Sequence, residues 1–212
     1  MSQGILVGGD HSGTGNFEAA AQDALQSLGA ELCPAGQPEM FCAVDKSTSA
    51  RTMLLQGPCR HVFADLMEQM SELGRDIVEH HRPLAWLASG RRIECFQNMY
   101  EQLLSRMHEV PPDDREMRCA RSGENVKAFV TRMSGSEYRP PIIIWLSGTE
   151  CYAFSTMGKQ ERAAHRNFET FLVWVLVVRK NKPHLLIHEI TELQPEGILE
   201  FFFADMYSII FN

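Results

Sequence analysis

Residues 5–15 read ILVGGDHSGTG, and this stretch decides the fold that we expect. The apolar run 5–7 has strand character and is closed by Gly8-Gly9-Asp10, after which comes the turn Ser12-Gly13-Thr14-Gly15. From residue 17 to 28 the apolar positions recur at helical spacing. A strand, a glycine-rich turn and a helix in this order predict the first unit of a parallel α/β sheet.

The same alternation continues outward from this stretch. Residues 40–44 are expected to form a second strand that ends in Asp45, and residues 61–64 a third strand that ends in Asp65. Residues 47–55, which lie between them, fit a helix. Three strands separated by helices predict βαβ units and a parallel sheet.

The C-terminal third has the same character. We expect buried strands at 142–146 and 185–188, helices at 165–180 and 195–204, and a further strand at 207–211. Residues 66–107 have helical periodicity, whereas the polar residues 113–138 can be assigned little structure. The expected fold is therefore α/β, a Rossmann-like sheet with helices on both faces and a mainly helical insertion. Its three parts are residues 1–66, 67–140 and 141–212.

Charge and composition limit the classes of function. The chain has 212 residues, of which 44% are apolar, and its Lys and Arg are outnumbered 20 to 27 by Asp and Glu. The resulting net charge of −7 disfavours strong DNA binding by this chain alone, because proteins that grip duplex DNA usually present a basic surface.

Targeting signals and cysteine spacing bear on the compartment. The N-terminus has no basic region before an apolar run, so we expect no signal peptide. The longest apolar run, residues 171–178, is too short to span a bilayer. The six cysteines lie scattered without a CxxC pair, which favours reduced thiols over a zinc site or disulfides. We therefore expect an intracellular protein, nuclear in a eukaryote and otherwise cytoplasmic, with no membrane partner and no metal.

Acidic residues follow the expected strands. In parallel sheets ligands bind beyond the carboxyl ends of the strands, where Asp10, Asp45 and Asp65 are placed. Asp45 can accept hydrogen bonds from ribose hydroxyls, and Asp65 can accept one from an adenine amino group. Together they indicate a nucleoside-bearing cofactor such as S-adenosylmethionine, although each could simply cap a helix. A dinucleotide is disfavoured, because Glu18 stands where its fingerprint needs a third glycine.

Two further strand ends carry reactive side chains. Cys151 follows strand 142–146 on a loop of small polar residues, which favours a nucleophile over an inert core cysteine. Glu189 follows strand 185–188. A carboxyl group that is screened from water there would have a raised pKa and could act as an acid.

Several motifs, in this order, resemble those of the cytosine-C5 DNA methyltransferases. Residues 10–18, DHSGTGNFE, are similar to the family's D-L-F-S-G-I-G-G-F, and residues 148–158, GTECYAFSTMG, to its catalytic loop G-P-P-C-Q-G-F-S-x-x-G. Residues 165–171, HRNFETF, resemble D-x-R-N-x-L-F, and residues 182–190, KPHLLIHEI, resemble K-P-x-x-x-x-x-E-N-V. The segments Ala43-Val44-Asp45 and Ala64-Asp65-Leu66 match the second and third motifs.

The resemblance implies a reaction and a site. Cys151 would attack C6 of a flipped cytosine and Glu189 would contact its Watson–Crick edge, so that C5 receives the methyl group of S-adenosylmethionine. The implied cofactor residues are Asp10, Ser12, Gly13, Thr14, Gly15, Phe17, Asp45, Lys46, Asp65 and Leu66. The implied DNA contacts are Ser155, Lys159, Gln160 and Arg166.

The chain departs from the family at several positions. Glu150 replaces the proline before the nucleophile, and an adjacent anion should raise the thiol pKa and repel phosphate. Ile190 replaces the asparagine of the sixth motif, and His11 a phenylalanine of the first. A literal Glu124-Asn125-Val126 precedes Cys151 in a polar stretch, and we interpret it as a coincidence.

Three functions remain open at this stage. The first is a methyltransferase whose target-recognition part would lie beyond Asn212 or in a partner chain, so that this chain alone binds its DNA substrate weakly. The second is an inactive S-adenosylmethionine-binding or interaction module derived from that family, for which Glu150 and Ile190 are the reasons. The third is a protein that binds another nucleotide or acts only as a scaffold.

Overall fold

The computed structural model divides the chain into two compact units. It describes residues 4–10, 16–27, 38–87, 91–106, 109, 116–127, 141–148, 168–189 and 198–207. The sheet unit comprises residues 1–69, 113–149 and 183–189, and the helical unit comprises residues 70–112, 150–182 and 190–212. The expected insertion, 67–140, thus contributes to both units.

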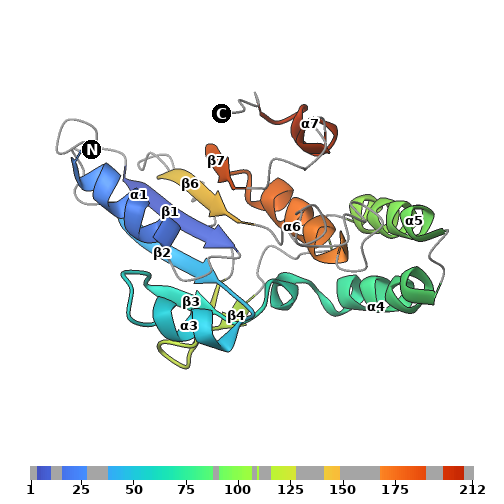
Figure 1. The fold of residues 1–212 in the computed structure, drawn as a ribbon, viewed down its shortest axis with the longest axis horizontal. Helices are drawn as coiled ribbons and strands as arrows, with labels where there is room; N and C mark the ends of the chain where they lie inside the picture. Colours follow the sequence, from blue (N-terminus) through green and yellow to red (C-terminus); the bar gives the residue numbers. More distant parts are fainter. Residues whose placement is uncertain are drawn as a thin grey trace. The chain divides into compact units, whose positions relative to one another are not determined.

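The sheet unit contains five parallel strands in the order β3-β2-β1-β6-β7 (Figure 1). The strands are β1 (Ile5–Asp10), β2 (Glu39–Val44), β3 (His61–Phe63), β6 (Ile142–Ser147) and β7 (Leu185–His188). The chain proceeds outward from β1 to β3 and then returns to the other side of β1 at β6. This strand order and the parallel pairing confirm the prediction of an α/β fold with a Rossmann-like sheet. Sheets of this kind bind ligands where the strand order reverses, which here is between β1 and β6.

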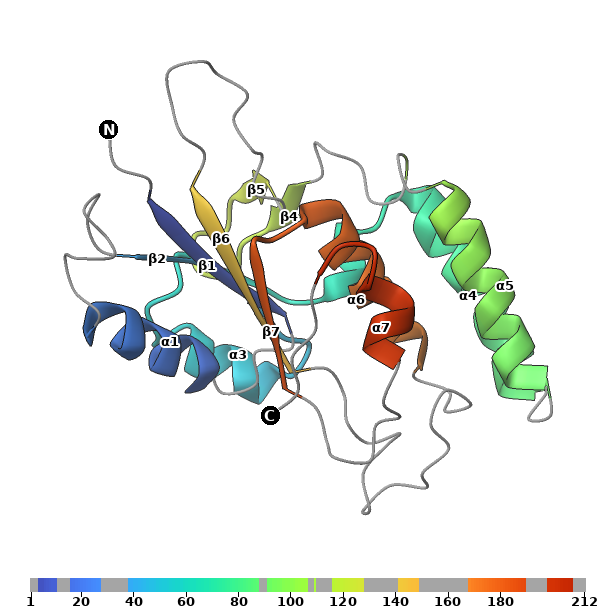
Figure 2. The ribbon, with the colours of Figure 1, turned by 90° about the horizontal axis from the view of Figure 1, so that it is seen from above.

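The core of the sheet unit lies between the sheet and two helices, α1 (Asn16–Ser27) and α3 (Thr48–Leu54), which cover the same face (Figure 2). Both helices fall where the sequence predicts them, and Ser47 caps α3 by accepting a 3.4 Å hydrogen bond from the Ala50 amide. The buried members of this core come from four strands, from α3 and, in Cys59, from the segment between α3 and β3: Val7, Met40, Ala43, Leu54, Cys59, Val62 and Leu146.

Strand β1 is longer than the sequence suggests. The residues expected to close it, Gly8-Gly9-Asp10, belong to the strand, and all three pair with β6. A Cβ on Gly8 would lie 2.5 Å from Cζ3 of Trp145, its partner on β6. The glycine at position 8 therefore makes room for an indole ring inside the sheet rather than starting a turn.

A hairpin that the sequence did not reveal extends the sheet unit. Strands β4 (Glu116–Arg118) and β5 (Asn125–Lys127) pair antiparallel, and Gly123 takes a φ of 74° in the turn between them. The Ala120 amide donates a 2.7 Å hydrogen bond to the Val62 carbonyl, and Arg121 donates to two carbonyls at the end of α3. The hairpin is thereby fastened beside β3, the edge strand on that side of the sheet. The Glu124-Asn125-Val126 triplet lies in this hairpin.

Strand β7 is not the buried strand that we expected. It forms the opposite edge of the described sheet, and Leu185 and Ile187 on one of its faces are 49% and 42% exposed. The apolar run of this strand gives no sign of its position at an edge, because hydrophobicity alone does not distinguish a central strand from an edge strand. The expected strand 207–211 lies outside the described residues from 208 onward.

The helical unit contains α4 (Glu72–Leu87), α5 (Arg92–Ser105), α6 (Phe168–Asn181) and α7 (Ile198–Phe203). The helical periodicity of residues 66–107 is confirmed by the short 3-10 helix η1 (Leu66–Gln69), which belongs to the sheet unit, and by α4 and α5. Aromatic rings hold α5, α6 and α7 together: Phe96 contacts Phe168 with ring centroids 5.7 Å apart, and Trp174 contacts Phe203 at 5.5 Å. No helix among the described residues is both long and apolar enough to cross a membrane.

Candidate functional site

The carboxyl ends of β1 and β6 carry a buried polar contact. Asp10, the last residue of β1, is fully buried, and its Oδ2 accepts a 2.6 Å hydrogen bond from Nε1 of Trp145. The carbonyl of Asp10 accepts a second bond, 3.4 Å long, from the amide of Gly148 after β6. One oxygen of Asp10 is thus engaged with a core indole, and the role of Asp10 toward a cofactor stays a prediction.

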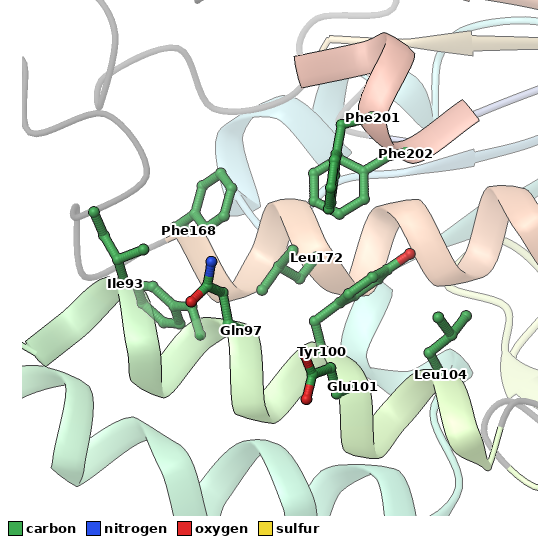
Figure 3. A pocket seen from close by; sticks show the side chains of 10 residues that line it. Ile93, Gln97, Tyr100, Glu101, Leu104, Phe168, Leu172, Phe201 and Phe202 are labelled. Atoms are coloured by element: carbon green, nitrogen blue, oxygen red, sulfur yellow. The ribbon is translucent and has the colours of Figure 1, made fainter. Parts of the chain in front are cut away.

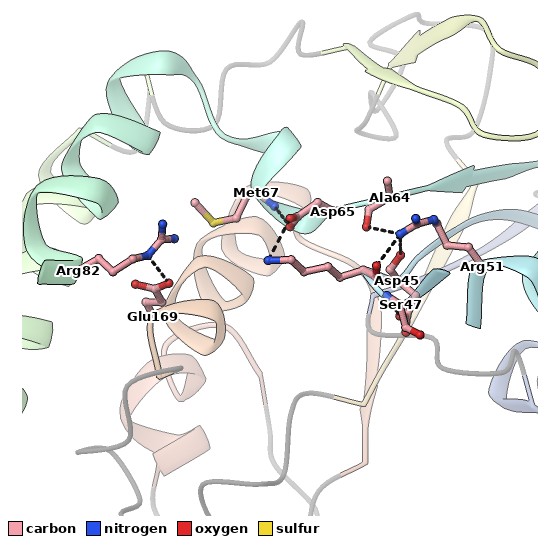
Figure 4. Close-up of polar contacts among 9 residues, drawn as sticks. Asp45, Ser47, Arg51, Ala64, Asp65, Met67, Arg82 and Glu169 are labelled. Atoms are coloured by element: carbon pink, nitrogen blue, oxygen red, sulfur yellow. Dashed lines mark hydrogen bonds and ion pairs between the residues drawn. The ribbon is translucent and has the colours of Figure 1, made fainter. Parts of the chain in front are cut away.

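Asp45 lies directly after β2 and is half-buried. Its Oδ1 accepts a 2.8 Å hydrogen bond from the amide of Ser47, which begins the turn into α3. Arg51 in α3 donates from Nη1 to the carbonyls of Asp45, Lys46 and Ala64 at 3.1, 2.6 and 3.4 Å (Figure 4). The guanidinium group therefore ties together the chain segments that leave β2 and β3, which fixes the two acidic residues at one edge of the sheet.

Asp65 occupies the corresponding place after β3. Its Oδ1 accepts a 2.9 Å hydrogen bond from the amide of Met67 at the start of η1. Its Oδ2 lies 3.5 Å from Nζ of Lys46, whose side chain is 84% exposed (Figure 4). Leu66, the neighbour with an expected cofactor contact, is buried in the structure at 4% exposure. The ion pair of Lys46 and Asp65 is exposed on the Lys46 side and so contributes little stability, which means that Lys46 can leave Asp65 at small cost.

Glu189 follows β7 on the same edge. Its amide donates a 2.8 Å hydrogen bond to the carbonyl of Ser147, the last residue of β6. Glu189 is exposed, so the screening from water expected for its carboxyl group is absent from this structure. The backbone bond nevertheless fixes Glu189 next to the end of β6, after which the chain continues toward Cys151.

The structure thus brings four of the predicted acidic residues to one edge of one sheet, at the ends of β1, β2, β3 and β7. Phe17 lies in the first turn of α1. The remaining predicted residues lie outside the described part of the chain, so their roles stay predictions: Ser12, Gly13, Thr14, Gly15, Cys151, Ser155, Lys159, Gln160 and Arg166.

Two residues that position this edge escaped the sequence analysis. In the sequence, Trp145 is one residue of an apolar strand, and Arg51 is one residue of a helix. The role of Trp145 is indicated by the glycine that lies opposite it, Gly8, but this pairing is known only once the register of β1 and β6 is known. For Arg51, whose three carbonyl partners come from two separate loops, the sequence contains no signal.

The described residues form no cluster of three or more His, Cys, Asp and Glu side chains suited to a metal ion. Comparisons with protein-family models, with curated proteins and with solved structures gave no match to this chain.

Proposed function

We propose that this chain is a cytosine-C5 DNA methyltransferase-like protein that binds S-adenosylmethionine at the carboxyl edge of its parallel sheet. The observation that carries the proposal is the placement of Asp45 and Asp65 at the ends of the neighbouring strands β2 and β3, beside the β1–β6 reversal. Nucleoside cofactors bind at this position in open α/β sheets.

The donor set at the edge suits a nucleoside. Asp45 is half-buried, and the side chain of Asp65 is 29% exposed, so each carboxylate can be reached from solvent. A ribose presents two hydroxyl donors and adenine an amino donor, which match carboxylate acceptors. Asp45 would hold the ribose, and Asp65 the adenine once Lys46 swings aside. Bound there, S-adenosylmethionine would supply a methyl group on a positively charged sulfur.

Catalysis would fall to Cys151 and Glu189. The thiolate of Cys151 would form a bond to C6 of a cytosine flipped out of the DNA helix, and the same bond would break when C5 loses its proton. Glu189 would hold a proton at N3 of the base and accept a hydrogen bond from the exocyclic amine. Closure of the site over DNA would have to remove Glu189 from water, since it is exposed in this structure.

Covalent trapping tests this chemistry. Duplex DNA that contains 5-fluorocytosine should form a denaturation-resistant adduct with the chain when S-adenosylmethionine is present, because fluorine at C5 cannot leave as a proton does. Cys151→Ala should abolish the adduct, whereas Cys95→Ala, which changes a half-buried thiol in α5, should leave it intact. Failure to form any adduct would contradict catalysis by this chain.

A second function is favoured by the exposure of Glu189 together with Glu150 and Ile190 in the sequence. In this alternative the chain keeps the nucleoside site and has lost the chemistry. S-adenosylhomocysteine would then bind, Asp45→Ala would weaken that binding, and no adduct would form on the fluorinated DNA. The two experiments together separate the alternatives.

A further inference from the structure

The helical unit contains an apolar cavity that the proposed function does not use. Its volume is about 530 Å³, within the range of sites for small organic ligands. Residues from three helices, α5, α6 and α7, form its walls (Figure 3). The described residues that line it are Ile93, Phe96, Gln97, Tyr100, Glu101, Leu104, Phe168, Leu172, Phe201 and Phe202.

The walls of the cavity are held in place by contacts of their own. The ring of Phe202 lies edge-on to Tyr100 with centroids 5.0 Å apart, and to Phe171 with centroids 5.7 Å apart. Arg179 in α6 donates a 2.6 Å hydrogen bond to the Phe202 carbonyl and two bonds, of 2.8 and 2.6 Å, to the carboxylate of Asp205. These bonds fasten α7 against α6, so the cavity exists before a ligand arrives and binding requires little ordering.

Apolar side chains at the cavity remain exposed to water. Phe201 is 77% exposed, Ile93 is 51% exposed and Leu104 is 38% exposed, and all three line the cavity. Each buries more carbon surface when a ligand with an apolar body covers it, which favours binding. Of the two aromatic rings of α7 that line the cavity, Phe202 is buried and Phe201 is the one that a ligand would cover.

The charge at the cavity is negative. Among its described lining residues Glu101 is the one charged side chain. The other polar groups of these side chains are the Gln97 amide and the Tyr100 hydroxyl. Arg179, which lies near Tyr100, does not line the cavity, and its charge is offset by the carboxylate of Asp205. Aromatic faces and a carboxylate both attract a cation, and neither suits a carboxylate or phosphate head.

We infer that this cavity binds a hydrophobic amine, a ligand with an apolar body and one positively charged nitrogen. The apolar body lies against Phe168, Leu172 and Phe201, and the ammonium group lies by Glu101 and the ring of Tyr100. This inference is independent of the proposed function, because none of the residues that line the cavity is assigned to cofactor binding, DNA binding or catalysis.

Three probes with the same tail test the choice of head group: octyltrimethylammonium, octanol and octanoate, each titrated into the full chain by calorimetry. The ammonium is expected to bind about tenfold more tightly than the alcohol, and the carboxylate more weakly than either. Equal affinities for the three probes, or the tightest binding by octanoate, would overturn the inference. Absence of binding by all three would overturn it as well.

Matched variants locate the site. Glu101→Gln should remove the preference for the ammonium while leaving the octanol affinity unchanged, and Phe201→Ala should weaken both probes. The controls are Glu94→Gln, an exposed acid in the same helix, and Leu84→Ala, a leucine in α4 that is 46% exposed; neither lines the cavity. The four side chains are exposed, so each variant should fold. If the controls weaken binding as much as their counterparts, the ligand binds elsewhere and the inference fails.

Discussion

The indole Nε1 of Trp145 donates a 2.6 Å hydrogen bond to Oδ2 of Asp10, across the two central strands of the sheet. Both residues are buried, at 1% and 0% exposure, and they lie where the strand order reverses. A carboxylate that is buried in the sheet needs such donors to offset its lost hydration. The indole of Trp145 therefore offsets part of the cost of burying Asp10 at the edge that carries the candidate site.

Replacing Trp145 by Phe tests this contact. Phenylalanine keeps a buried aromatic ring but removes the donor, and leaving the buried Asp10 oxygen without this partner should lower the free energy of unfolding by about 2 kcal/mol. Urea denaturation measures this change. In an Asp10→Ala background the same substitution should cost less, because the acceptor is absent; equal costs in both backgrounds would show that the hydrogen bond does not contribute to stability.

Gly8 should be intolerant of the smallest side chain. A Cβ at this position would lie 2.5 Å from Cζ3 of Trp145 and 3.1 Å from Sγ of Cys42. We expect Gly8→Ala to destabilise the protein by roughly 1–3 kcal/mol, the usual cost of overpacking a core. Gly4→Ala is the matched control, since a Cβ there meets nothing within 4 Å. Thermal unfolding of both variants measures the difference, and equal melting temperatures would contradict the packing argument.

The glycines at positions 8 and 9 also show the limit of the sequence analysis of the fold. Strand and helix alternation predicted the parallel sheet, because hydrophobic periodicity and capping residues are local properties. The sequence suggested that Gly8 ends a strand, whereas its partner Trp145 makes it part of one. Likewise the hairpin of β4 and β5 has strands of three residues, each with one apolar side chain, and its fastening to Val62 and Leu54 depends on distant contacts.

Acid should destabilise the helical unit through His81. This side chain in α4 is 6% exposed, and its pKa is lowered, mainly by burial and in smaller part by the neighbouring His80. Because the native pKa lies below the unfolded value near 6.5, the unfolded state binds more protons in the interval between them. Stability is therefore complete above pH 6.5 and falls as the pH drops through the lowered pKa.

The pH effect is measured by urea unfolding at several pH values between 7.5 and 5. His81→Gln should reduce the loss of stability between pH 7 and 5. Part of the loss should remain, because the pKa of His61 is also lowered by burial and by Arg60. His80→Gln, which changes the exposed neighbouring histidine, is the control and should leave the loss of stability in acid nearly unchanged. If His81→Gln loses as much stability in acid as the unaltered chain, His81 is not the cause of the loss.

The ion pair of Arg82 and Glu169 joins α4 to α6. Their side chains are 33% and 10% exposed, and Nε of Arg82 lies 2.8 Å from Oε1 of Glu169 (Figure 4). Arg82→Met should cost on the order of 2 kcal/mol, because it leaves a largely buried carboxylate without this cation. Arg75→Met in the same helix should cost less than about 0.5 kcal/mol. Chemical denaturation measures both, and Glu169→Gln in the Arg82→Met background should recover part of the loss.

For the candidate site, the sequence identified the strand ends but not what the side chains do there. The order of Asp45 and Asp65 along the chain predicted that they meet at one edge, and parallel pairing of β2 with β3 brings them there. Asp45 and Asp65 each accept a hydrogen bond from the amide two residues later, of Ser47 and of Met67, and such short-range bonds can be predicted from sequence. The exposure of Glu189 could not be predicted, because it depends on which strand forms the edge of the sheet.

Calorimetry with S-adenosylhomocysteine shows whether the carboxyl edge of the sheet binds a nucleoside cofactor. We expect micromolar binding, on the order of −8 kcal/mol, that weakens at least tenfold in Asp45→Ala. The control is Glu39→Ala, which removes an acid from the opposite end of the same strand and should leave the affinity unchanged. No binding to the unaltered chain, or an equal loss in both variants, would contradict a cofactor site at this edge.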